Sequence, residues 1–172
     1  MGGHSARLFI GPMKQAKTAF SMVEMVLVMI IIAVMAGIAM PRFSQAIVRH
    51  QLDAAVRRVT MDLAYARKRA MQTSTPQRVM FDMTSDTYVL AQTSDPNHAT
   101  QTYLVDLTRE PYHATISQIE FRTAAQAVGD PVVVFDIYGM PDSGGSLTIT
   151  VGTSTATITL DGQSGNVTTT YG

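Results

Sequence analysis

The segment that decides the fold is KTAFSMVEMVLVMIIIAVMAGIAMPRF, residues 17–43 of the 172-residue chain. Residues 25–40 form an uninterrupted apolar run, which would extend about 24 Å as an α-helix at 1.5 Å per residue. Extending the helix back to residue 20 brings it close to about 30 Å, the thickness of the hydrocarbon core of a bilayer. We therefore expect one transmembrane helix over residues 20–41.

The flanks of this helix indicate its orientation. Upstream lie Arg7, Lys14 and Lys17 and no acidic residue, a bias that keeps the amino-terminal side in the cytoplasm and sends the remainder across the membrane. A secretory signal peptide has a similar layout, and a small-residue site for its cleavage exists at residues 37–39. A signal peptide gains nothing from an acid at the head of its apolar core, so we expect the chain to remain anchored.

A single carboxylate, Glu24, stands at the start of the apolar run. A charge at the edge of a bilayer needs a partner, and residues 20–41 contain no basic residue to provide one. Cleavage between Ala19 and Phe20 would create an α-amino group one helical turn from Glu24, in the same copy or in a neighbouring one. The alternative is that the Glu24 side chain simply reaches outward to water.

These features resemble the type IV pilins and the pseudopilins of type II secretion systems. That family has a short basic leader, a cleavage site before Phe, Glu at the fifth mature position and about twenty apolar residues. The resemblance implies that the prepilin peptidase cuts between Ala19 and Phe20 and methylates the new amine. It also implies that Glu24 sets the register between subunits and that Pro41 kinks the helix.

The leader, residues 1–19, departs from the family in two ways. Ala19 stands where the family prefers Gly before the cut, and the leader is long. A start at Met13 instead of Met1 would give the leader MKQAKTA, which has the usual length.

Beyond Pro41 the sequence predicts an amphipathic helix over residues 42–74. Apolar residues recur at spacings of three and four, which is one face of an α-helix. These residues are Val48, Leu52, Val56, Val59, Leu63, Ala66 and Ala70. Pro41 removes one backbone hydrogen bond and is expected to bend the helix without ending it, whereas the segment ending in Pro76 stops it.

The charge of the chain is segregated. Residues 42–70 carry seven basic and two acidic residues, whereas residues 71–172 carry three basic and ten acidic residues. A basic helix before an acidic body suits the packing of one copy against another. Nucleic acid is the less favoured partner of the basic segment, because the acids downstream can pair with it.

From Pro76 onward the hydrophobic period changes from 3.6 to 2, which predicts a β-domain over residues 75–172. Thr and Val dominate this region, as expected on a half-buried sheet. The predicted strands cover residues 78–81, 87–91, 103–107, 116–121, 132–135, 146–151, 156–160 and 166–170. The expected fold is α+β and pilin-like, with a long N-terminal helix packed on an antiparallel β-domain.

Parts of this domain resemble one subgroup, the GspH/FimT minor pseudopilins and minor pilins. Residues 63–81, LAYARKRAMQTSTPQRVMF, are similar to the end of the helix and the first strand of that subgroup. The block VVVFDIYGMPDSGGSLTITV, residues 132–151, is similar to a later strand and glycine-rich turn. Members that bind DNA carry basic residues near the C-terminus, and the tail DGQSGNVTTTYG has none.

No constellation of residues points to catalysis. The chain has no cysteine, and its four histidines are scattered without the spacing of a metal site. The resemblance to pseudopilins, whose major members bind calcium in a loop near the C-terminus, makes the turn between Asp136 and Asp142 the candidate calcium loop, but backbone capping is the ordinary role of Asp beside glycine-rich turns. We therefore expect no enzyme activity, no cofactor and no metal.

Together these features predict a minor pseudopilin of a type II secretion system, packed through its hydrophobic helix into a periplasmic pseudopilus that assists protein export. The alternatives are a minor type IV pilus subunit, which serves pilus assembly or DNA uptake, and a membrane-anchored binding domain that does not polymerise. The expected partners are the prepilin peptidase, other pseudopilin or pilin subunits and the bacterial inner membrane. The expected topology is a single pass with a cytoplasmic N-terminus and a periplasmic C-terminal domain.

Overall fold

The computed structural model describes residues 20–95, 100–121 and 131–172, and the side chains of residues 38–42 are outside this description. The predicted leader, residues 1–19, lies outside the described residues as a whole. The chain divides into two compact units, Met1–Pro41 and Arg42–Gly172.

Helix α1 (Met22–Thr73) is 52 residues long, and its residues belong to both units. The carbonyl of Ser21 accepts a hydrogen bond from the backbone N–H of Met25 at 3.1 Å, so Ser21 stands at the N-cap. Glu24 is then the third helical residue, and the sequence Ser-x-x-Glu is that of a capping box. These two residues favour a helix that begins at this point.

The far end of α1 lies where the sequence predicts it. The helix is continuous through Pro41, which therefore does not end it. Ser74 follows the last helical residue with φ of 49°, in the left-handed region where helices commonly terminate, and Pro76 comes two residues later.

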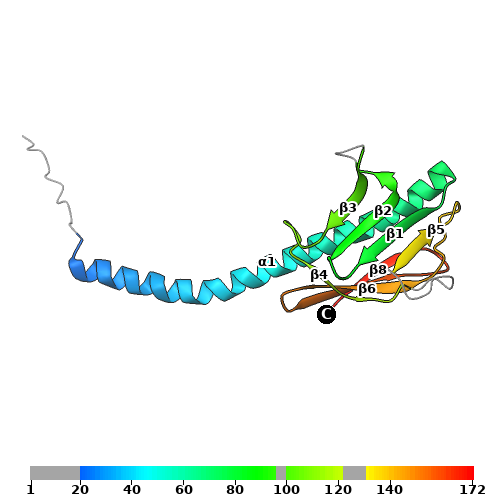
Figure 1. Ribbon diagram of the computed structural model, residues 1–172. Helices are drawn as coiled ribbons and strands as arrows, with labels where there is room; N and C mark the ends of the chain where they lie inside the picture. Colours follow the sequence, from blue (N-terminus) through cyan, green and yellow to red (C-terminus); the bar gives the residue numbers. More distant parts are fainter. Residues whose placement is uncertain (1–19, 96–99, 122–130) are drawn as a thin grey trace, which may run out of the picture. The chain divides into compact units, whose positions relative to one another are not determined.

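Eight strands form two four-stranded antiparallel sheets (Figure 1). The first sheet has the strand order β3-β2-β1-β5, and the second has the order β4-β6-β7-β8. The strands of the first sheet are β1 (Gln77–Asp82), β2 (Thr87–Ser94), β3 (Thr102–Asp106) and β5 (Val132–Phe135). The strands of the second sheet are β4 (Thr115–Ile119), β6 (Gly145–Val151), β7 (Ser154–Leu160) and β8 (Val167–Tyr171). Each predicted strand overlaps one of these, so the α+β class is confirmed.

The turn between β6 and β7 is tighter than the sequence suggests. The predicted strands leave four residues between them, but Val151 pairs with Ser154, which leaves a two-residue turn. Gly152 supplies the positive φ, 58°, that such a hairpin needs.

The apolar face predicted on α1 completes the core of the β-domain. Six of its residues are buried, and Val48 is partly buried against them. The inward-facing residues of both sheets belong to the same core, among them Val79 and Phe81 from β1 and Ile149 from β6. Each such side chain contributes about 1.5–3 kcal/mol when it leaves water, so this half of α1 is an integral part of the domain.

Candidate functional site

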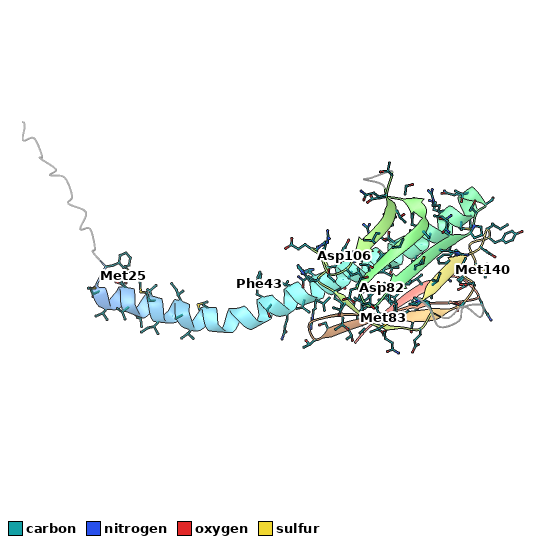
Figure 2. All side chains as sticks on the ribbon, in the orientation of Figure 1. Met25, Phe43, Asp82, Met83, Asp106 and Met140 are labelled. Carbon is teal, nitrogen blue, oxygen red and sulfur yellow. The ribbon has the colours of Figure 1, made fainter. Side chains whose placement is uncertain are left out.

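The first half of α1 holds its apolar side chains in an exposed position. Every described side chain from residue 20 to residue 37 is exposed. The exposed fraction of the large apolar side chains runs from 47% at Val28 to 85% at Met22, and Met25 (Figure 2) is 56% exposed. A continuous apolar surface of this kind marks a site of interaction with lipid or with other proteins.

Glu24 is the only charged residue in this exposed segment. It lies in the first turn of α1, where the positive end of the helix dipole favours a carboxylate. Phe20, the predicted first residue after cleavage, lies two residues before the helix and is 78% exposed. Phe20 and Glu24 therefore share one end of α1, whereas Ala19 lies outside the described residues.

Among the residues that the structure describes, no helix combines the length and the hydropathy that a membrane crossing requires. The span predicted from the sequence, residues 20–41, includes residues 38–41, whose side chains fall outside the described set. Pro41 is one of these residues, so the kink expected there stays a prediction.

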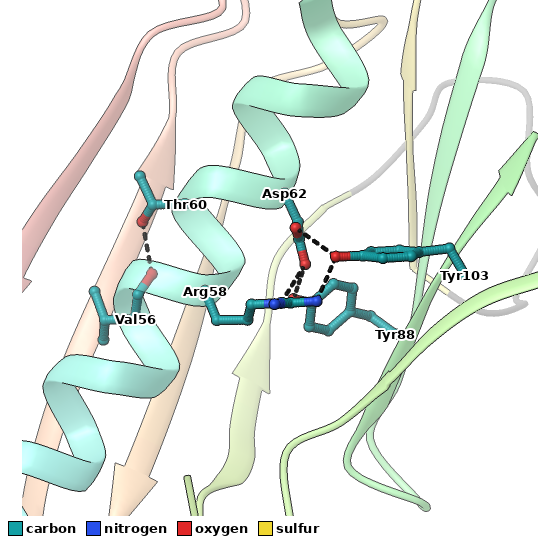
Figure 3. A network of polar contacts seen from close by, with 6 residues as sticks. All are labelled: Val56, Arg58, Thr60, Asp62, Tyr88 and Tyr103. Atoms are coloured by element: carbon teal, nitrogen blue, oxygen red, sulfur yellow. Dashed lines mark hydrogen bonds and ion pairs between the residues drawn. The ribbon is translucent and has the colours of Figure 1, made fainter. Parts of the chain in front are cut away.

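A second group of polar side chains joins α1 to the first sheet (Figure 3). Asp62, on α1, is only 6% exposed. Its carboxylate accepts hydrogen bonds from the Tyr88 hydroxyl at 2.5 Å, from the Tyr103 hydroxyl at 3.0 Å and from Arg58 Nε at 3.0 Å. Arg58 also donates to the Tyr103 hydroxyl and stacks over the ring, with Cζ 5.5 Å from the ring centroid. The four side chains, here called the Asp62 cluster, link α1 to β2 and β3 of the first sheet.

The negative charge of the buried Asp62 carboxylate is stabilised by its three hydrogen-bond donors. A buried carboxylate is tolerated when donors surround it, as they do here. Burial and the Asp62 carboxylate raise the pKa of Tyr103 to about 12, and they also raise the pKa of Tyr88. Burial would lower the pKa of Arg58, but Asp62 and the tyrosines raise it above its ordinary value. Both phenols therefore stay protonated at neutral pH and can donate to Asp62.

Sequence reasoning missed this cluster, although one signal was present. Asp62 follows Val59 by three residues and precedes Ala66 by four, so it falls on the apolar face of the predicted helix. A lone acid at such a position indicates a buried polar contact. Its partners Tyr88 and Tyr103 depend on which strands pair, and local sequence does not specify that.

Three aspartates accept hydrogen bonds from backbone N–H groups: Asp136 and Asp161 cap their own turns, whereas Asp142 bonds to Val134 in β5. Within the described ranges no three His, Asp or Glu side chains are placed to hold a metal ion. His4 and His98 lie outside those ranges.

Comparison with protein-family models, with curated proteins and with solved structures finds no match to this chain.

Proposed function

We propose that this chain is a minor pseudopilin, a subunit that packs through the exposed apolar half of α1 into a periplasmic filament and assists protein export. The proposal is carried by one observation, the combination of a lone carboxylate, Glu24, with a run of exposed apolar side chains along the first turns of a helix. Removal of these side chains from water favours insertion into a bilayer and then packing against the helices of other subunits.

Glu24 would give this packing its register. A carboxylate left alone in an apolar bundle costs several kcal/mol, because nothing offsets its desolvation. Cleavage before Phe20 would supply a positive amine four residues from Glu24, about 6 Å along a helix axis. A second copy shifted along that axis by one turn then places its amine beside the Glu24 of its neighbour, and the ion pair forms.

Glu24 also has a local role, which an experiment must separate from register. As the third residue after the cap, its side chain can accept a hydrogen bond from the N–H of Ser21, and it interacts favourably with the helix dipole. Gln at position 24 keeps the capping bond and removes the charge. The substitution Glu24→Gln therefore keeps the capping bond and removes the interactions that depend on charge, whereas Glu24→Ala removes the capping bond as well.

The second half of α1 supports the same proposal. Its apolar face belongs to the core of the β-domain, and the Asp62 cluster fixes it to the first sheet. In a filament, the helix that packs against other subunits must be firmly attached to the β-domain of its own subunit. Residues 42–73 meet this need, because they form part of that domain.

The role in secretion is supported by the resemblance of residues 63–81 and 132–151 to the GspH/FimT group. As that resemblance implies, the prepilin peptidase cuts before Phe20 and methylates the new amine. The processed subunit then waits in the bacterial inner membrane until it is packed into the filament. In this proposal the β-domain is periplasmic and the chain performs no catalytic step.

Intact-mass measurement and N-terminal sequencing of the full chain, extracted from membranes, test the proposal. We expect methylated Phe20 as the first residue. Ala19→Gly is the matched control and should be cut at the same bond at least as completely. A chain that begins at Met1 or Met13 would favour an anchored domain that does not polymerise. A chain that begins at Met40 would indicate a signal peptide and would also overturn the proposal.

A further inference from the structure

The outer face of the first sheet carries a row of apolar side chains. Met80 of β1 lies opposite Val89 of β2, and Val89 lies opposite Leu104 of β3. Directly opposed residues of antiparallel strands share one face of the sheet, with Cβ atoms about 5 Å apart. Val132 of β5, which is buried, lies opposite Met80 and continues the row to the other edge.

This row points away from the core. Along β1, Val79 and Phe81 face inward and are each 1% exposed, so Met80 between them faces outward. Leu104 is 56% exposed, Met80 is 37% exposed and Val89 is half-buried. Helix α1 and the second sheet share one core with the inner face of the first sheet, so they pack on the other side. A row of apolar side chains left in water across neighbouring strands marks a surface of contact.

Opposite charges flank the row along β1. Arg78 precedes Met80 by two residues and Asp82 follows it by two, so all three side chains share the outer face. At about 3.4 Å per residue, Arg78 and Asp82 are about 14 Å apart and cannot pair within one copy. Arg78 is exposed, and among the described residues it forms no ion pair.

Asp82 is ionised and is positioned by the β1–β2 turn. Its carboxylate accepts hydrogen bonds from the Ser85 hydroxyl at 2.7 Å and from the N–H of Thr84 at 2.8 Å, and these bonds lower its pKa. Asp106, at the same end of β3 (Figure 2), already pairs with Arg109 at 2.8 Å. Asp82 is therefore the acid at this end of the row whose partners in the described chain are all uncharged.

We propose that this face binds the same face of a second copy of the chain, related to the first by a two-fold axis that runs along the apolar row. Such an axis reverses the direction of the strands. Met80 then lies against Met80 of the second copy, and Arg78 faces Asp82 of the second copy. By symmetry this ion pair forms twice. The contact is isologous and closes on two copies, so it is independent of the contacts made by residues 20–37.

The pattern of charge selects this occupant and this orientation. A two-fold axis parallel to the strands would bring the two Arg78 side chains together at one end and the two Asp82 side chains together at the other, which is repulsive. The exposed apolar half of α1, residues 20–37, offers one acid, Glu24, and no base, so it would leave Asp82 without a cation. Of these three arrangements, the reversed second copy alone covers the apolar row and pairs both charges.

The size of the face indicates a weak contact. Four strands about 4.8 Å apart give a width of about 14 Å, and residues 78–82 give a length of about 14 Å. A contact of these dimensions buries less than the area of about 800 Å² per partner that is usual in a stable interface. The two copies therefore exchange readily, and covalent capture is the suitable measurement.

Cysteine crosslinking of the full chain in detergent tests the pairing. The chain has no cysteine, so a single introduced thiol can react only with the same position of a second copy. Packed sheet faces lie about 10 Å apart, within the reach of a short bis-maleimide. We expect Met80→Cys to give a covalent dimer and the control Met61→Cys, at a position 65% exposed on α1, to give only the background of random collision. No dimer from Met80→Cys, or equal yields from the two positions, would overturn the pairing.

Two neutral substitutions test the reversed orientation. In a Met80→Cys chain, Arg78→Gln or Asp82→Asn should each lower the dimer yield by about fivefold, because either one removes both exposed ion pairs. Asn at position 82 keeps an oxygen that can accept the hydrogen bonds of the turn.

The two substitutions together should lower the yield by about fivefold again and no more, because they remove the same ion pairs. Within one copy positions 78 and 82 are too far apart to be coupled, so this non-additivity can arise only between copies. Losses that multiply to about 25-fold, or no loss from either substitution, would overturn the pairing of Arg78 with Asp82 of the second copy.

Discussion

The hydroxyl of Tyr88 donates a 2.5 Å hydrogen bond to the carboxylate of Asp62, which lies 26 residues earlier in the chain. Tyr88 is 1% exposed and Asp62 is 6% exposed, so neither group has water as an alternative partner. The bond connects α1 to the inner face of the first sheet and makes the helix part of the domain.

Loss of Asp62 should therefore destabilise the fold strongly. Asp62→Ala leaves Arg58 and two phenols without their acceptor, and breaking such a buried arrangement costs about 3–5 kcal/mol. Tyr88→Phe removes one donor and should lower the free energy of unfolding by about 1–2 kcal/mol. Urea unfolding of the full chain in detergent measures both changes. Tyr65→Phe, on the exposed face of α1, is the control and should change stability by less than about 0.5 kcal/mol. Equal stability of Asp62→Ala and the unsubstituted chain would show that the cluster does not hold the helix.

Stability should also fall in alkaline solution. The pKa of Tyr103 is raised from 10.0 to about 12, so the folded chain holds this phenolic proton more strongly than the unfolded chain does. The protonated Tyr103 phenol therefore adds to the free energy of unfolding. This contribution is complete below about pH 10 and is lost as the pH rises toward about 12. Urea unfolding over this range should show a steeper loss in the unsubstituted chain than in Tyr103→Phe. The same slope in both would rule out this phenol as its source.

Local periodicity explains which parts of the fold the sequence predicts. The spacing of apolar residues in α1 identifies the buried face, and the alternation in segments such as residues 146–151 identifies the strands. The division into two sheets depends on long-range pairing, for example Val79 opposite Val133 and Ile116 opposite Ile149. No local pattern encodes these partners.

In the candidate site, too, local sequence predicts some residues, and long-range contacts determine others. The sequence alone singles out Glu24, because a charge beside a long apolar run is conspicuous. It does not single out Tyr88 as a partner of Asp62, because this contact depends on the packing of β2 against α1. That contact joins residues distant in sequence and becomes visible only in the folded chain.

The loop between β5 and β6, residues 136–144, packs on α1 through Gly139, and a substitution there tests this contact. Gly139→Ala combines a positive φ with a Cβ that would lie 2.9 Å from Met71 Sδ, and it should cost about 1–3 kcal/mol of stability. The free energy of unfolding of the full chain and the rate of proteolysis within residues 136–144 measure the effect. Gly37→Ala is the control, because nothing lies within 4 Å of that position and alanine favours a helix by about 0.5–1 kcal/mol. A neutral Gly139→Ala would mean that Gly139 does not pack closely against Met71.

Charge and capping at Glu24 should have separable effects on assembly. Glu24→Gln is expected to insert into membranes normally and to enter filaments poorly, because the capping bond remains and the charge is lost. Ser21→Ala is the matched control, since it weakens the helix cap by about 1 kcal/mol but keeps the carboxylate. The measurement is the amount of each variant in sheared filaments relative to membranes. Normal incorporation of Glu24→Gln would remove the register role of the carboxylate.

The central claim is that the carboxylate of Glu24 in one copy meets the amine of Phe20 in another. Carbodiimide treatment of assembled filaments built from isotopically heavy and light copies tests it directly, because this reagent joins a carboxylate only to an amine in contact with it. We predict an amide between Glu24 of one isotopic form and Phe20 of the other, which is absent in Glu24→Gln. Filaments in which this amide forms only within single copies, or does not form, would contradict the account.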